Sequence, residues 1–225
     1  MKRRLERWKS RKAERLDAEA KALEERIQQR LRDIDRFHTE RLCERYRHLV
    51  PPERIQKVKD LPTVFEDRKA FERSYAQADG RKPPEGHQVA GFSRYTLEPA
   101  HVDMDNPQLR KNAVHERVHQ LSDPRARELL GEKVHEGITE DVAIKELGEE
   151  PNAELPRSYS QERATARKLR ELCGDGAVDR AYFQGDAREL RSCLEHRLGK
   201  GNLEKLKDAA DAPVLPDRPT EKEEG

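Results

Sequence analysis

Two histidines one helical turn apart, His115 and His119, constrain this chain of 225 residues more than any other feature. They belong to the sequence HERVH, and residues four apart on an α-helix share a face, so both imidazoles can reach one ion. Zinc accepts neutral imidazole, and a catalytic zinc site uses three protein ligands and leaves a fourth position for water. Glu116 projects about 100° further round the helix, where its carboxylate can take a proton from that water. The pattern predicts a metal site that still needs a third ligand.

The segment His135–Glu140, with the sequence HEGITE, can supply that ligand. We expect Glu136 to be the third, oxygen ligand. Glu140, one turn later on the same face, can accept a hydrogen bond from the far ring nitrogen of a metal-bound histidine. Gly137 has no side chain, which would let this helix approach the HERVH helix closely. We expect His135 to be a neighbour of the site, because a fourth protein ligand would take the position of the water.

HERVH followed by EGITE resembles the gluzincin metallopeptidases, the thermolysin-like group, whose second helix reads roughly N-E-x-x-S/T-D/E. It looks most like small bacterial gluzincin-like proteins that carry HExxH followed by EGxTE. The interval between the motifs is slightly shorter here than in the best-known members, and His135 stands where they usually have asparagine. The resemblance covers about residues 89–198 and implies a zincin-like fold and peptide-bond hydrolysis. It also implies one zinc ion held by His115, His119 and Glu136, with Glu116 as general base and Glu140 as the hydrogen-bond partner of a ligand.

A site of this kind also uses a donor that polarises the substrate carbonyl. Tyr159, Tyr182 and His196 follow the ligands in the chain, and each belongs to a residue type that also packs in cores or caps helices. Tyr159 is the candidate that we retain for this role.

Composition limits the classes of protein that remain. With 40% charged and 33% hydrophobic residues, the chain can build one modest core and hardly two full domains. The net charge of +1 gives no argument for specific nucleic-acid binding or for an anionic membrane. No apolar run is long enough to span a bilayer, and none follows the basic start as in a signal peptide.

Three cysteines without a CxxC spacing, Cys43, Cys173 and Cys193, favour a reducing, cytoplasmic location. Export by a specialised secretion system would leave no signal peptide and is the alternative. Neither Cys173 nor Cys193 has a motif partner that would indicate a thiol protease.

The first 50 residues predict one long amphipathic helix, which Pro51 and Pro52 end. Its apolar residues recur at steps of three and four, at Leu16, Ala20, Leu23, Ile27, Leu31 and Ile34. We expect a separable helical or coiled-coil arm that contacts a partner helix or a second copy of itself. A nucleic-acid or lipid contact is the less favoured alternative, because acidic residues are interleaved throughout.

The metallopeptidase domain is expected over residues 53–205, followed by a disordered tail at 212–225. Residues 53–78 read as helical with a break at Pro62, and strands are expected only within 89–95 and 97–104. In a zincin the strand before the metal helix lies along the cleft, where an extended substrate can pair with it. The rest of the domain reads as helical.

Taken together, the residues predict an α+β, mostly α chain with a zincin-like domain, a small sheet and an N-terminal helical arm. The predicted function is a zinc-dependent hydrolase that cleaves peptide bonds of a protein or peptide substrate. Two alternatives remain: a zinc-stabilised interaction module without catalysis, and a helical adaptor in which HERVH is accidental.

Overall fold

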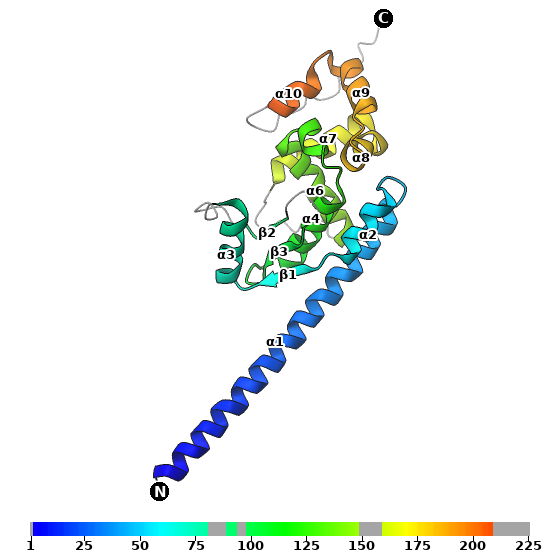
Figure 1. Cartoon of the computed structure of the whole chain (residues 1–225). Helices are drawn as coiled ribbons and strands as arrows, with labels where there is room; N and C mark the ends of the chain where they lie inside the picture. The colour runs from blue at the N-terminus through cyan, green and yellow to red at the C-terminus, as the bar shows by residue number, and fades with distance from the viewer. Residues whose placement is uncertain (1, 81–88, 94–97, 149–158, 209–225) are drawn as a thin grey trace, which may run out of the picture.

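The computed structural model describes residues 2–80, 89–93, 98–148 and 159–208. This part of the chain is mostly helical and carries one small sheet, as expected for an α+β, mostly α protein (Figure 1). The strands are β1 (Thr63–Glu66), β2 (Gly91–Phe92) and β3 (Ala100–Asp103). The helices are α1 (Lys2–Tyr46), α2 (Pro52–Asp60), α3 (Arg68–Asp79), α4 (Leu109–Leu121), α5 (Ala126–Leu130), α6 (Glu132–Leu147), α7 (Ser160–Cys173), α8 (Asp175–Phe183), α9 (Arg188–Leu198) and α10 (Asn202–Asp208).

The three-stranded sheet has the order β1-β3-β2, with β3 parallel to β1 and antiparallel to β2. β3 is the strand that precedes α4, the helix that carries HERVH, and it is paired on both sides. It therefore cannot receive an extended substrate, contrary to our expectation. Among the described residues, β2 lies at the edge of the sheet nearer the candidate site, because Gly91 contacts Glu116.

β1 corrects a second expectation, because residues 53–78 were predicted to be helical. Residues Thr63–Glu66 instead alternate between buried and half-buried side chains and pair with β3 over four positions, from Thr63 opposite Ala100 to Glu66 opposite Asp103. This alternation is the period of a strand with one covered face. The helices α2 and α3 flank it.

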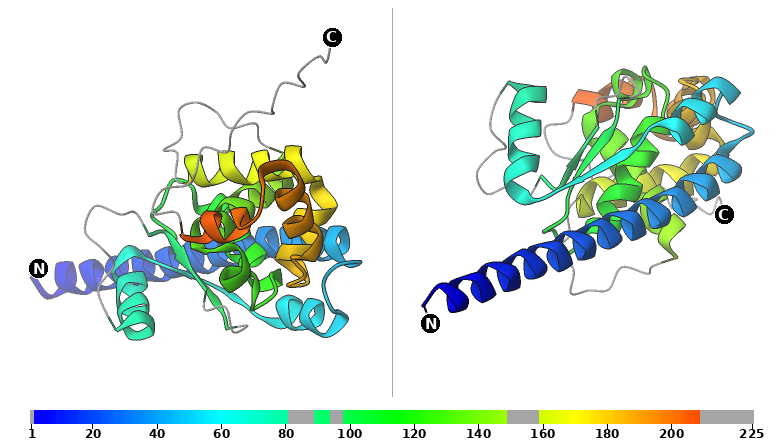
Figure 2. Two further views of the ribbon diagram at one scale, coloured as in Figure 1. Left: turned by 90° about the horizontal axis from the view of Figure 1, so that it is seen from above. Right: turned by 60° about the horizontal axis from the view of Figure 1, so that its bottom comes forward.

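The helices α4 and α6 pack together at the centre, and α7 covers α6 on its other side (Figure 2). We had expected Gly137 to let α6 approach α4. It lies instead at the contact between α6 and α7. A Cβ atom at Gly137 would lie 2.1 Å from the carbonyl oxygen of Glu162 on α7, so a larger residue would push the two helices apart.

One hydrophobic core joins the end of α1 to α4 and to the helices from α5 to α10. Its largest fully buried side chains include Leu42, Leu121, Ile138, Leu169, Tyr182, Phe183, Leu190 and Leu194. A smaller cluster of Phe65, Val102 and Ala113 fixes the sheet against α4. The helix α4 therefore lies between the two clusters.

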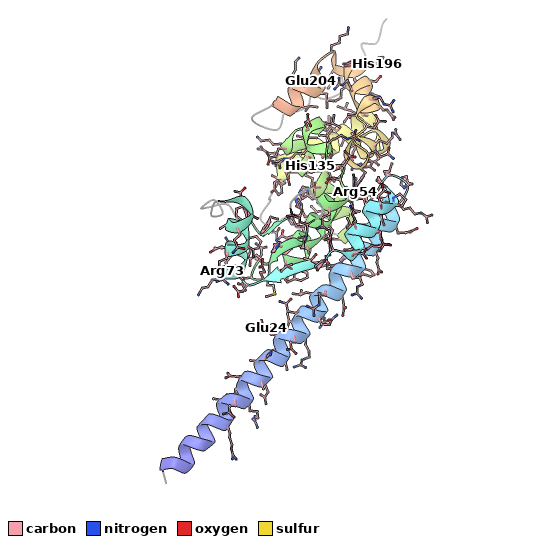
Figure 3. All side chains as sticks on the ribbon, in the orientation of Figure 1. Glu24, Arg54, Arg73, His135, His196 and Glu204 are labelled. Carbon is pink, nitrogen blue, oxygen red and sulfur yellow. A yellow bond between two sulfur atoms is a disulfide. The ribbon has the colours of Figure 1, made fainter. Side chains whose placement is uncertain are left out.

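The helix α1 divides into a free part and a docked part. Residues 11–27 are exposed and stand clear of the domain, where Glu24 marks the free part in Figure 3. From Gln28 onward the helix docks, and Leu42, Tyr46 and Val50 are buried in the main core. The main core therefore extends across the predicted boundary between an arm at 1–50 and a domain at 53–205.

Cys173 and Cys193 form a disulfide that joins α7 to α9, and Cys43 is a buried free thiol. This pairing was not predicted from the sequence, because we had treated the three cysteines as unpaired. No helix among the described residues has the length and apolar character needed to cross a membrane. The predicted disordered tail at 212–225 lies outside the described residues.

Candidate metal centre

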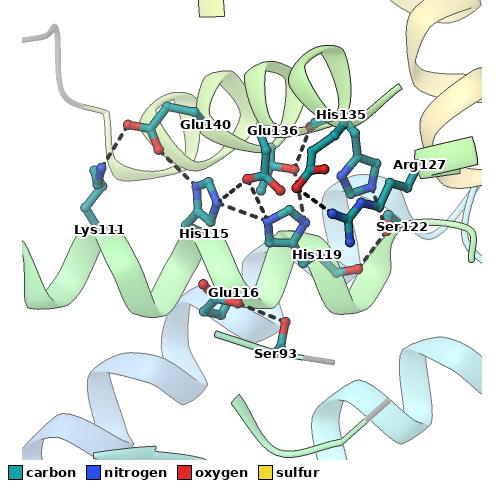
Figure 4. A network of polar contacts seen from close by, with 12 residues as sticks. Ser93, Lys111, His115, Glu116, His119, Ser122, Arg127, His135, Glu136 and Glu140 are labelled. Atoms are coloured by element: carbon teal, nitrogen blue, oxygen red, sulfur yellow. Dashed lines mark hydrogen bonds and ion pairs between the residues drawn. The ribbon is translucent and has the colours of Figure 1, made fainter. Parts of the chain in front are cut away.

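The structure brings together the three predicted metal ligands, His115, His119 and Glu136. The Nε2 atoms of the two histidines lie 3.0 Å apart, and each lies 3.2 Å from Oε2 of Glu136 (Figure 4). An ion with four tetrahedral ligands at about 2.0–2.1 Å has neighbouring ligands about 3.3–3.4 Å apart. The triangle therefore fits a single ion of this kind, and two imidazoles with one carboxylate are a donor set that suits zinc.

Burial of α4 explains why the ligands are held so closely. From Ala113 to Leu121 every side chain of α4 is buried, because the helix lies between the sheet and α6. The four-residue spacing places His115 and His119 on the side that faces α6, and Glu136 reaches them from the first turns of that helix. The ligands thus come from two rigid helices and not from loops.

Glu140 occupies its predicted position beside the first histidine. Its Oε2 atom lies 3.0 Å from Nδ1 of His115, and its Oε1 atom accepts a hydrogen bond from Nζ of Lys111 at 2.9 Å. When Nε2 of His115 binds a metal, Nδ1 carries the hydrogen and donates it to Glu140. Lys111, which was not predicted, fixes the carboxylate from the preceding turn of α4.

Thr139 plays the corresponding part for the second histidine. Its Oγ1 atom lies 3.3 Å from Nδ1 of His119, 2.6 Å from the hydroxyl of Tyr182 and 2.8 Å from the carbonyl oxygen of His135, to which it donates. The threonine oxygen can therefore accept hydrogen bonds from His119 and Tyr182 together. Thr139 and Glu140, the last two residues of EGITE, thus each contact one histidine of the triangle.

His135 is a neighbour of the ligands, as expected, and lies outside the triangle. Its ring is fully buried, stacks on His119 with a centroid distance of 5.1 Å, and approaches Oγ of Ser122 through Nε2 at 3.4 Å. Burial, with the charge of His119, lowers the pKa of His135 to about 3. The ring is therefore neutral and packs against the site from one side.

Electrostatics in the triangle favour a cation. Burial alone lowers the pKa of His115, but the hydrogen bonds that its ring donates to the carboxylates of Glu136 and Glu140 outweigh burial and raise this pKa to about 10. Burial alone raises the pKa of Glu136, but the two histidines outweigh it and hold this pKa well below its usual value. The carboxylates that stabilise a proton on His115 would equally stabilise a metal ion in its place.

Glu116 lies beside the triangle without joining it. Figure 4 shows its carboxylate next to Ser93, whose hydroxyl donates a hydrogen bond of 2.8 Å to Oε2. A Cβ atom at Gly91 would lie 2.9 Å from Oε1, so only glycine leaves room for this carboxylate against β2. Burial raises the pKa of Glu116, and His119 and His115 partly offset this effect. A carboxylate with a raised pKa is a stronger base than an ordinary one and can hold a proton more firmly once it accepts it.

Tyr159 immediately precedes α7 and stacks on His115 with a centroid distance of 5.5 Å and an interplanar angle of 15°. Its φ of 59° is the only positive value among the described non-glycine residues. Such a conformation costs energy in a bulky residue and is often found at functional sites. Burial and the nearby carboxylates raise the pKa of Tyr159, so its hydroxyl keeps its hydrogen and remains a donor.

No protein-family model, curated protein or solved structure matches this chain. The interpretation of the site therefore rests on its residues and geometry. Sequence reasoning located the triangle, Glu116, Glu140 and Tyr159. It missed Ser93 and Lys111, which carry no motif signal, and assigned no role to Thr139, although it stands at the S/T position of the EGITE pattern.

Proposed function

We propose that this protein is a zinc-dependent peptidase of the gluzincin type, with a zincin-like domain. The observation that carries the proposal is the separation of roles at the site. His115, His119 and Glu136 form a three-donor triangle, while the buried carboxylate of Glu116 stays outside it and is held by Ser93. A purely structural zinc site is closed by four protein ligands, whereas three ligands with an adjacent base are typical of hydrolases.

In this proposal His115, His119 and Glu136 would hold a zinc ion, which would supply activation of a water molecule and polarisation of the substrate carbonyl. Glu116 accepts the proton of the attacking water and later donates it to the departing amine nitrogen. Its raised pKa suits both transfers, because a base that binds its proton too weakly cannot return it. The hydroxyl of Tyr159 donates a hydrogen bond to the carbonyl oxygen as negative charge develops there.

The substrate is a protein or peptide in extended conformation. Support comes from β2, whose Gly91 touches Glu116 and whose outer side has no strand partner among the described residues. Pairing along this edge would hold the main chain of the substrate beside the base. The small size of Gly91 would then serve two purposes, since it also leaves room for the carboxylate.

The replacement Glu116→Gln tests the proposal. Glutamine keeps the shape of the side chain and can still accept the Ser93 hydrogen bond, but it cannot act as a base. Peptide hydrolysis should fall by about 10²–10⁴-fold while one equivalent of zinc remains bound. Glu128→Gln, at an exposed position of α5, is the matched control and should leave the rate unchanged. The substrate would come from proteome-wide cleavage mapping with the zinc-loaded wild type.

A second candidate function is a zinc-stabilised interaction module without turnover. The observation that favours it is the exposed apolar side of α1, where Leu16, Leu23 and Ile27 lie in solvent. Wild-type biological effect from the Glu116→Gln variant would support this module and contradict the peptidase. The third alternative, an accidental motif, predicts no bound zinc at all.

A further inference from the structure

The helix α1 carries an apolar stripe that the domain does not cover. Leu16, Leu23 and Ile27 are 50%, 52% and 49% exposed, and Ile34 and Phe37 continue the line at 37% and 53%. The docked side of the helix is a different one, formed by Gln28, Leu31, Asp35, His38, Leu42 and Tyr46. The stripe therefore remains available along the arm, including the part that stands clear of the domain.

The stripe has the spacing of a coiled-coil seam. Alternating steps of four and three residues join Leu16, Ala20, Leu23 and Ile27, and the same alternation continues through Arg30, Ile34 and Phe37. In heptad terms, Ala20, Ile27 and Ile34 occupy a positions, while Leu16, Leu23, Arg30 and Phe37 occupy d positions. A helix of this pattern gains stability by burying the seam against another helix.

We propose that the occupant of this seam is the α1 helix of a second copy of this chain, running antiparallel. In the register that we infer, Leu16 faces Ile27 of the second copy and Ala20 faces Leu23 of the second copy. The small Ala20 thus meets a larger residue, and Leu16 meets one of its own size, so no layer consists of two small side chains. This inference does not depend on the proposed peptidase function.

Charge complementarity selects the antiparallel register. On the flanks of the seam, Glu19 meets Arg26 of the second copy, and Lys12 meets Asp33 of the second copy, each twice by symmetry. Glu19 also has Arg15 at 3.2 Å on its own helix, so it would join a small network. The unfavourable pair is Asp17 with Glu24 of the second copy, which lies at an exposed edge and is screened.

A parallel pair of the same helices is less favourable in the seam itself. Arg30 would face Arg30 of the second copy at a d position, which brings two like charges together where solvent is excluded. Ala20 would face Ala20 of the second copy, and two such small side chains would leave this layer of the seam poorly filled. In the antiparallel register Arg30 faces Ala13 of the second copy, where its long side chain has room to reach solvent.

Sedimentation equilibrium of the full chain tests the association. We expect dimers at about micromolar concentration, and a monomer for Leu23→Glu, because a charge would be placed within the seam. Ala18→Glu is the matched control, since residue 18 lies at the exposed f position opposite the seam and should leave the dimer intact. A wild-type chain that stays monomeric up to about 100 micromolar would overturn the proposal, as would equal weakening by both variants.

Spin labels at two positions test the orientation. In the antiparallel register, residue 21 lies beside residue 22 of the second copy, so labels at Lys21→Cys should be close in the dimer. Residue 11 lies opposite residue 32 of the second copy, so labels at Arg11→Cys should be about 30 Å apart along the axis, at about 1.5 Å per residue. Short distances at both positions would show a parallel pair and overturn the register. Cys43 is buried and should not react.

Discussion

Arg117, which lies between the two histidines of the metal helix, makes a two-pronged ion pair with Asp35 of α1. Its Nη2 atom lies 2.6 Å from Oδ2 of Asp35 and its Nε atom 3.1 Å from Oδ1, and both residues are buried. Arg117 also donates to the carbonyl oxygens of Val58 and Leu61. The docked part of α1 therefore holds α4 in place on the face opposite His115 and His119.

Truncation of α1 should separate its two parts. Removal of residues 2–24 takes away exposed side chains from the described part of the arm, so zinc binding should be unchanged, and so should the midpoint of thermal unfolding at concentrations where the full chain is monomeric. Removal of residues 2–40 should unfold the domain, because it leaves Arg117 and Glu146 buried without Asp35 and His38. A buried charge that loses its partner costs about 3–5 kcal/mol. Circular dichroism melts would check both variants, and a stable, zinc-binding product of the longer deletion would contradict this account of α1.

Thr139 should be needed to orient His119. Thr139→Val keeps the shape of the side chain but removes the oxygen that accepts from Nδ1 of His119, so zinc affinity should fall by about 10–100-fold. Thr139→Ser retains the hydroxyl and should therefore keep most of the zinc affinity of the wild type. Thr165→Val, at another buried threonine on α7, is the control. Competition titrations with a chelating dye measure the affinities, and equal losses for valine and serine would indicate a packing effect alone.

Glu140 should act on the metal through His115. Glu140→Ala removes the acceptor for Nδ1 and should weaken zinc binding by about 10–100-fold while leaving the fold intact. Lys111→Met frees only the other carboxylate oxygen and should have a smaller effect in the same direction. If the zinc titration of Glu140→Ala matched that of the wild type, Glu140 would be no more than a buried ion-pair partner of Lys111.

Asp141 should make stability depend on acid. Burial alone raises its pKa, but Lys145, Arg170 and Arg167 outweigh this and hold the pKa below 3.8. A lowered folded-state pKa contributes stability that is present above the unfolded-state pKa of about 3.9 and is lost as the pH falls through the folded-state value.

Asp141→Asn should therefore lower the free energy of unfolding at pH 7, by about 3 kcal/mol for a buried charge network. It should also flatten the decline of stability below about pH 4. The control is Asp175→Asn, an exposed partner of Arg170 whose loss should cost no more than about 1 kcal/mol. Urea unfolding between pH 2 and 7 measures the free energy of unfolding of both variants and the wild type. If this free energy depended on pH in the same way for Asp141→Asn and for the wild type, Asp141 would not be the source of the acid sensitivity.

The disulfide should contribute measurably to stability. Cys173 and Cys193 are 20 residues apart in sequence, and closing a loop of this size contributes about 3 kcal/mol in the chain-entropy account. Reductant should lower the urea midpoint of the wild type to that of the double variant Cys173→Ser/Cys193→Ser, which should itself be insensitive to reductant. A wild-type midpoint that does not respond to reductant would mean that the bond does not form in solution.

The sequence predicted what local pattern determines. The helix pair α4 and α6, the ligand triangle and the position of Glu140 follow from spacing along helices, because residues four apart share a face whatever lies around them. The end of α6 at Gly148, with a φ of 67°, also follows from a local preference for glycine.

What the sequence did not predict depends on contacts between distant segments. β1 is a strand because it pairs with β3, and its four residues are too few to show a period by themselves. The ion pair of Asp35 with Arg117 and the bond between Cys173 and Cys193 require the fold before they can be recognised. Gly137 is a further example, because a glycine at this position indicated a close contact between helices but not that the partner would be α7.

The origin of the three donors from two helices has a consequence for the lifetime of the protein in a cell. Without an ion, the interface of α4 and α6 must keep two imidazoles and a carboxylate buried together. A chain in this state unfolds more often than a chain in which the three side chains bind one ion. Cellular proteases act on the opened population. We therefore expect the abundance of this protein to follow the supply of zinc, and to fall in zinc-starved cells even while its messenger RNA stays constant.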